Sequence, residues 1–165
     1  MLITLLLSLC LMISLFVLLY AAVALIQDRR FFTTAPKAIQ EVIEDKKERF
    51  KGAHFLGYFL AIVSILSMII ALIYAGIDGK NNNFGFIDYF LRYLIMFLLL
   101  KAFDIIFFDY YLLGKSNFFT HYYPETKEYV GLKNFGYNIK DHLIQIVIFI
   151  VFSFVVALLL SKISL

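Results

Sequence analysis

The sequence has one cysteine, no tryptophan and two prolines among its 165 residues. Because Cys10 is alone, a disulfide within the chain, a CxxC redox motif and a cysteine-based zinc site are excluded. Charged residues are also scarce, at 16%, where a soluble domain has about a quarter. Hydrophobic residues reach 62% and the mean hydropathy is +0.87. This apolar excess is too large for a soluble core and indicates an integral membrane protein.

The charges are gathered into short stretches, and long apolar runs separate them. About 20 apolar residues are enough to cross a bilayer as a helix. The pattern therefore predicts one all-α, polytopic membrane domain over residues 1–165, with four transmembrane helices at about 2–26, 54–77, 84–113 and 142–162. The first run has no basic start, so we expect a retained helix rather than a signal peptide.

The third apolar segment differs from the others because it holds five ionisable side chains: Asp88, Arg92, Lys101, Asp104 and Asp109. A charged group at membrane depth costs a few kcal/mol unless it is paired, hydrated or functional. We interpret this segment as a crossing helix, which makes its charges the main candidates for function.

Basic residues predict the orientation. Eleven lie between the first and second helices or between the third and fourth: Arg29, Arg30, Lys37, Lys46, Lys47, Arg49, Lys51, Lys115, Lys127, Lys133 and Lys140. Only Lys80 and Lys162 lie in the other polar segments. Basic loops stay in the cytoplasm, so both termini are expected outside, N-out and C-out. Abundant Ile, Phe, Lys, Asn and Tyr are typical of an AT-rich bacterial genome, and we expect a multi-pass protein of the bacterial inner membrane.

Apolar residues recur at helical spacing over about residues 35–50, where Thr34 can act as the N-cap and Pro36 lies in the first turn. This pattern predicts a cytoplasmic amphipathic helix on the membrane surface or against the segment between the third and fourth helices, or an ordinary connector helix. The outer segment 78–83 has the composition of a turn.

Small residues lie at four-residue intervals on two of the predicted helices: Ser67, Ala71, Ala75, and Ser153, Ala157, Ser161. Small residues let helices approach closely in lipid, so we expect the second and fourth helices to pack through these positions. The third helix is expected to lie further from its neighbours.

Two pairs are spaced for ion pairing along the third helix. Asp88 and Arg92 are four residues apart and are expected to form a structural ion pair. Lys101 and Asp104 are three apart and favour a salt bridge, a proton relay or a substrate site. Asp104 and Asp109 should be about 140° apart on a straight α-helix.

All three histidines fall on the predicted cytoplasmic side, at His54, His121 and His142. We take Lys101, Asp104, Asp109, His121, Glu125 and His142 as the candidate polar site. Three imidazoles and several carboxylates on one side could bind zinc, iron or manganese, but no two of them have a recognised metal spacing. We therefore assign no metal ligand, and the cofactor stays unknown. The aromatic stretch 118–127 favours either an interfacial loop or a lid over the inner end of the third helix.

Four segments resemble a family of small four-helix bacterial membrane proteins of uncharacterised activity: Arg49–Gly52, Phe103–Tyr110, Ser116–Phe119 and His121–Lys127. That family has an FDxxxxDW-type stretch late in its third helix, and Tyr110 stands where tryptophan is usual. The resemblance implies four helices and draws attention to Asp104 and Asp109.

No P-loop, dinucleotide-binding fingerprint or GxSxG motif is present, and acids among the basic residues argue against nucleic-acid binding. The main hypothesis is a non-catalytic lipid-binding, scaffold or accessory membrane protein. The alternatives are a small enzyme acting on a lipid or isoprenoid at the cytoplasmic interface, and a homo-oligomeric transporter. Membrane lipids are the expected partners.

Overall fold

The computed structural model describes residues 1–33, 35–131 and 135–164. The chain is 79% helical and the described residues contain no strand, so the all-α prediction is confirmed. Contacts divide the chain into two compact units. The first unit contains Met1–Ser14, Leu66–Ala102 and the chain from Ile139, and the second contains Leu15–Ile65 and Phe103–Asn138.

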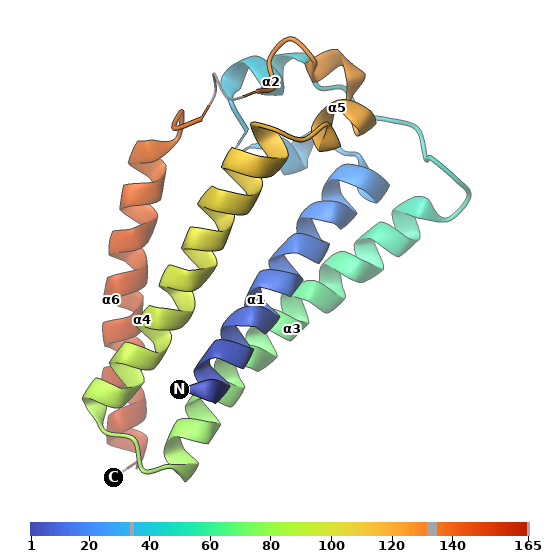
Figure 1. Ribbon diagram of the computed structural model, residues 1–165. Helices are drawn as coiled ribbons and strands as arrows, with labels where there is room; N and C mark the ends of the chain where they lie inside the picture. Colours follow the sequence, from blue (N-terminus) through green and yellow to red (C-terminus); the bar gives the residue numbers. More distant parts are fainter. Residues whose placement is uncertain (34, 132–134, 165) are drawn as a thin grey trace. The chain divides into compact units, whose positions relative to one another are not determined.

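Within the described residues, three helices are long and apolar enough to cross a membrane (Figure 1). The first is α1 (Leu2–Tyr20), which continues into the π-helix η1 (Ala21–Ile26). The others are α3 (Ala53–Asn81) and α6 (Ile139–Ser164). Only 11% of the most apolar window of α6 is buried, and soluble proteins rarely expose so much continuous apolar surface. The helices predicted at 2–26, 54–77 and 142–162 are therefore present, with the last two longer than expected.

The predicted third segment forms α4 (Phe86–Phe103), which continues as the π-helix η3 (Asp104–Leu113). Buried residues recur along α4 at intervals of three and four, which places them on one face: Tyr89, Arg92, Tyr93, Met96, Phe97, Leu100 and Lys101. Unlike the three helices above, α4 has charged residues within its apolar sequence, and its length and composition alone do not identify it as a membrane span.

A tight turn joins α3 to α4. The Asn83 backbone is left-handed (φ +54°), and the Phe84 N–H donates to the Gly79 carbonyl at 2.9 Å, which closes the end of α3. The Asp88 carboxylate accepts from the Gly85 N–H at 3.0 Å, at the start of α4. Asp78, expected in a turn, lies instead in the last turns of α3 and is buried.

The predicted small-residue packing is only partly correct. Ala75, Ser153 and Ala157 are fully buried and Ala71 is nearly so, but Ser161 is partly exposed. The Ser67 hydroxyl contacts Ser14 of α1 at 3.1 Å rather than α6. Near the ends of α3 and α6, Gly76 approaches the Leu160 side chain. Small residues thus permit α3 and α6 to approach each other closely, but α1 and α4 also contact these helices.

The expectation that the third helix lies far from its neighbours was wrong. Long polar side chains of α4 reach backbone carbonyls of α3: Tyr93 donates to Leu72 at 2.8 Å, and Arg92 donates to Ala75 at 2.9 Å. On its other side, the Phe97 ring stacks on Phe149 of α6 with centroids 5.0 Å apart. Aromatic and hydrogen-bonding groups achieve here the close packing that we expected only from small residues.

The amphipathic helix predicted over 35–50 was wrong in its extent. Helix α2 covers only Lys37–Val42, and Ile43 has an extended backbone. The Lys46 N–H donates to the Gln27 carbonyl at 3.2 Å, and the Glu48 carboxylate accepts from the N–H of His54 at the start of α3. These long-range hydrogen bonds replace the helical ones. Thr34, the expected N-cap, lies outside the described residues.

Candidate functional site

Short helical segments of the second unit form a cap, which we define as η2 (Arg29–Phe32), α2, α5 (Phe118–Tyr122) and η4 (Pro124–Thr126). Figure 1 shows α2 and α5 near each other. The cap shares one apolar cluster with the end of η3: Val23, Phe32, Ile39, Ile43, Leu113 and Tyr123. The aromatic stretch 118–127 is therefore packed against the end of η3, and its role as a lid stays a prediction.

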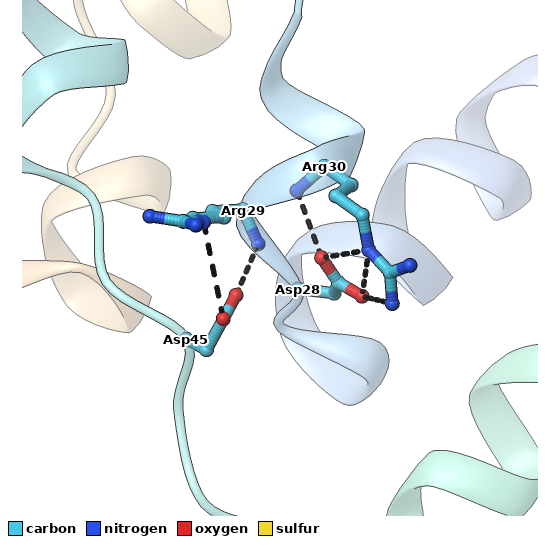
Figure 2. Close-up of polar contacts among 4 residues, drawn as sticks. All are labelled: Asp28, Arg29, Arg30 and Asp45. Carbon is cyan, nitrogen blue, oxygen red and sulfur yellow. Dashed lines mark hydrogen bonds and ion pairs between the residues drawn. The ribbon is translucent and has the colours of Figure 1, made fainter.

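Two aspartates fix the η2 turn of the cap (Figure 2). Asp28 is the N-cap residue: its carboxylate accepts from the Arg30 N–H at 2.8 Å and pairs with the Arg30 guanidinium at 2.6 Å. These hydrogen bonds from Arg30 lower the pKa of Asp28 below its ordinary value. The Asp45 carboxylate accepts from the Arg29 N–H at 2.8 Å. Together they hold the turn that carries Phe31 and Phe32.

A second ion pair ties η4 to the segment that follows α2. The Lys46 ammonium lies 2.6 Å from the Glu125 carboxylate. Burial alone would raise the pKa of Glu125, but Lys46 and backbone N–H donors outweigh it and lower the pKa. Beside this pair, burial raises the pKa of the Tyr123 hydroxyl, and the Tyr123 ring meets Phe32 edge-on at 4.8 Å. The cap is thus an ordered element rather than a plain linker.

The π-helical geometry of η3 places Asp104 and Asp109 on the same pocket. In a π-helix the backbone hydrogen bonds join residues five apart, so side chains at i and i+5 diverge much less around the axis than they do on an α-helix. Both carboxylates are half-buried and line one cavity. The expectation that they diverge by about 140° assumed an α-helix and was wrong for that reason.

This cavity, which we call the carboxylate pocket, has a volume of about 110 Å³. Its remaining walls come from η1, the cap, η3 and the segment before α6: Leu19, Ala22, Val23, Phe31, Phe32, Ala35, Pro36, Ile39, Phe108, Leu113, Phe119 and Tyr137. The Asn138 amide donates to Asp109 at 3.3 Å. Pockets for drug-sized ligands are about 300–1,000 Å³, so this one accommodates only a few heavy atoms.

The other candidate residues do not line the carboxylate pocket. Glu125 pairs with Lys46, as described, and His121 is exposed on α5 with its ring against Tyr122. Lys101 and His142 belong to the first unit, where both are buried. There the Lys101 ammonium donates to the Gln145 side chain of α6. Of the six predicted site residues, the structure brings Asp104 and Asp109 together.

The predicted ion pair between Asp88 and Arg92 was also wrong. The Arg92 guanidinium is buried and lies 2.6 Å from the Asp78 carboxylate of α3, while Asp88 caps the start of α4. The Phe84 ring lies 4.2 Å from the same guanidinium. Arg92 therefore pairs with the buried carboxylate of Asp78 on the neighbouring helix, and not with the exposed carboxylate of Asp88 on its own helix.

Sequence reasoning missed the aromatic walls of the pocket and the role of Asp78. Phe31 and Phe32 lie in one segment and Tyr137 in another, both far from Asp109 in the sequence, so no local pattern links them to it. For Asp78 there was a signal: an acidic residue shortly before a turn faces the beginning of the next antiparallel helix, where Arg92 needed a partner.

Among residues 1–33, 35–131 and 135–164, no group of three or more His, Cys, Asp and Glu side chains is placed to hold a metal ion. Comparison with family models, with curated proteins and with solved structures finds no match to this chain.

Proposed function

We propose that this chain is a four-span protein of the bacterial inner membrane, with both termini outside. We also propose that it binds a membrane amphiphile by holding the ammonium group of that ligand. The fourth span is α4. Its two buried cationic side chains have partners that offset the free-energy cost of burying a charge in a membrane: Arg92 pairs with Asp78, and Lys101 donates to Gln145. The orientation rests on the eleven basic residues of the two cytoplasmic segments.

The observation that carries the ligand class is that two carboxylates and several aromatic rings line one small pocket. Carboxylates attract a cation by charge, and aromatic faces attract it through their quadrupole, which is how proteins bind amines and quaternary ammonium groups. The pocket holds only a headgroup, so the apolar tail of the ligand would extend outside it. Amine-bearing lipids and hydrophobic amines both have this chemistry.

The experiment measures binding of decyltrimethylammonium to the purified protein in maltoside micelles by titration calorimetry. The double variant Asp104→Asn/Asp109→Asn should bind at least about tenfold more weakly, which corresponds to about 1.4 kcal/mol, because the quaternary ammonium has no N–H to donate and is held by attraction to the two carboxylate charges. Asp141→Asn, which removes an exposed carboxylate at the start of α6, is the matched control. Equal affinity of the wild type and the double variant would refute the proposal.

The second candidate is a small enzyme acting on a lipid at the cytoplasmic interface. The presence of Asp104 and Asp109 in the lining of one pocket favours it, because two carboxylates in one pocket can divide the roles of acid and base. Incubation of the protein with a bacterial lipid extract, followed by mass spectrometry, separates the two functions. A product formed by the wild type and absent with Asp104→Asn would favour the enzyme, and an unchanged extract favours binding alone.

A further inference from the structure

A second cavity lies in the first unit, between α3, α4 and α6, and has a volume of about 380 Å³. We call it the lateral groove. Gly76 and Ile77 line it from α3, Tyr93 from α4, and Val156 and Leu160 from α6. Its volume lies within the range of about 300–1,000 Å³ that is usual for ligand sites. It is separate from the carboxylate pocket and shares no residue with it.

The surface of the groove is apolar for an identifiable reason. The Tyr93 hydroxyl donates to the Leu72 carbonyl and the Tyr89 hydroxyl to the Gly76 carbonyl, so each polar end is already bound. The rings therefore contribute carbon surface to the groove. Gly76 adds no side chain where one would meet the Tyr93 hydroxyl at 3.2 Å, which leaves space beside α6. An apolar chain could fill this space without leaving a buried polar group unpaired.

A positive charge lies at one end of the groove. Lys80, in the last turn of α3, is exposed and makes only a long contact of 3.4 Å with the Ile163 carbonyl. Ile163 lines the groove at the same end. The carboxylate of Asp78, two residues before Lys80, is paired with Arg92. An ammonium group at the mouth of an apolar groove on a membrane helix suits an anionic headgroup attached to an alkyl chain.

We infer that the lateral groove holds one acyl chain of an anionic phospholipid, with the phosphate of that lipid beside Lys80. The inference rests on the membrane insertion proposed above, but not on the ammonium ligand. Filling the groove should displace the chain, and removing the Lys80 charge should weaken the preference for an anionic headgroup while leaving the apolar site in place.

Native mass spectrometry of the protein with phosphatidylglycerol or phosphatidylcholine in maltoside tests this inference. Val156→Trp should reduce the lipid-bound fraction about tenfold, since the larger indole fills space that the methylene groups of the acyl chain would occupy. Val155→Trp, on the exposed face of α6 and outside the groove, should leave the bound fraction unchanged. Lys80→Gln should bind both lipids alike, and Lys162→Gln should keep the preference for phosphatidylglycerol.

The controls separate the possible failures. Equal lipid retention by Val156→Trp and Val155→Trp overturns the inference, and so does a wild type without preference between the two lipids. A dimer that Val156→Trp abolishes would show that a second copy fills the groove, and would also overturn it. Circular dichroism must show unchanged helicity in both tryptophan variants. Asp104→Asn/Asp109→Asn should retain phosphatidylglycerol fully, so the two proposed sites fail or succeed independently.

Discussion

At the scale of single residues, the pairing of Arg92 with Asp78 determines how α4 can be buried. The guanidinium is 5% exposed, and an ion pair that loses one partner leaves an uncompensated charge that costs about 3–5 kcal/mol. Asp78→Leu should therefore lower the free energy of unfolding by about this amount, whereas Asp88→Ala should cost only about 1 kcal/mol, the value of a helix cap. Thermal unfolding in detergent measures both. If Asp88→Ala lowers the free energy of unfolding more than Asp78→Leu does, Arg92 pairs with Asp88, as helical spacing had predicted.

Asp28 gives the cap a dependence on pH. Arg30 lowers the pKa of Asp28 in the folded state below its ordinary value of 3.8. A depressed carboxylate pKa stabilises the fold above the unfolded-state pKa of about 3.9, and this contribution is lost as the pH falls from about 4 through the lowered pKa. Limited proteolysis within residues 28–49 should accelerate over that range. The Asp28→Asn variant should be cleaved faster at neutral pH, and its cleavage rate should no longer depend on acid. If the acid dependence remains in this variant, a titrating group other than Asp28 causes it.

At the scale of helices, the contact between α3 and α4 depends on a glycine. A β-carbon on Gly79 would lie 2.4 Å from the ring of Tyr89, which is itself fully buried. Overpacking of this kind costs about 1–3 kcal/mol, so Gly79→Ala should lower the unfolding temperature clearly. Gly85→Ala is the matched control, since its β-carbon would lie 3.6 Å from the Asp88 carboxylate, at ordinary contact distance. If Gly79→Ala proves as stable as Gly85→Ala, the helices do not approach this closely.

The same scale shows where sequence reasoning worked and where it stopped. Apolar length and composition identified α1, α3 and α6 because each is a long uninterrupted run. Periodicity did not predict the end of α2, because hydrogen bonds of Lys46 and Glu48 to distant backbone groups replaced the helix. It also assumed α-helical turns at Asp104 and Asp109, and no simple sequence pattern distinguishes the π-helical turns of η3. The candidate aspartates were found, but their shared pocket was not.

At the scale of the whole molecule, charge distribution and hydropathy predict the membrane class and the orientation, but not which helices neighbour one another. The neighbours depend on paired groups far apart in the sequence, such as Asp78 with Arg92 and Lys46 with Glu125. Each pair joins two charges that looked unrelated along the chain. This is why the candidate pocket required the structure, whereas the topology is a prediction that can be tested without it.

Cysteine accessibility tests that topology most directly. Cys10 is the only native cysteine, so Cys10→Ser provides a background without thiols. Lys51, Asn82 and Lys127 are exposed and lie before α3, between α3 and α4, and after η3, respectively. With N-out topology, a membrane-impermeant maleimide should label Asn82→Cys in intact cells, and should label Lys51→Cys and Lys127→Cys only after permeabilisation.

Each comparison in this experiment reports on one helix. Labelling of Lys51→Cys and Asn82→Cys from opposite sides shows that α3 crosses, and opposite labelling of Asn82→Cys and Lys127→Cys shows that α4 with η3 crosses. Labelling of Asn82→Cys and Lys127→Cys from the same side would mean that α4 does not cross. The paired charges of Arg92 and Lys101 would then stabilise a helix outside the bilayer, and the carboxylate pocket would lose its place at the cytoplasmic interface.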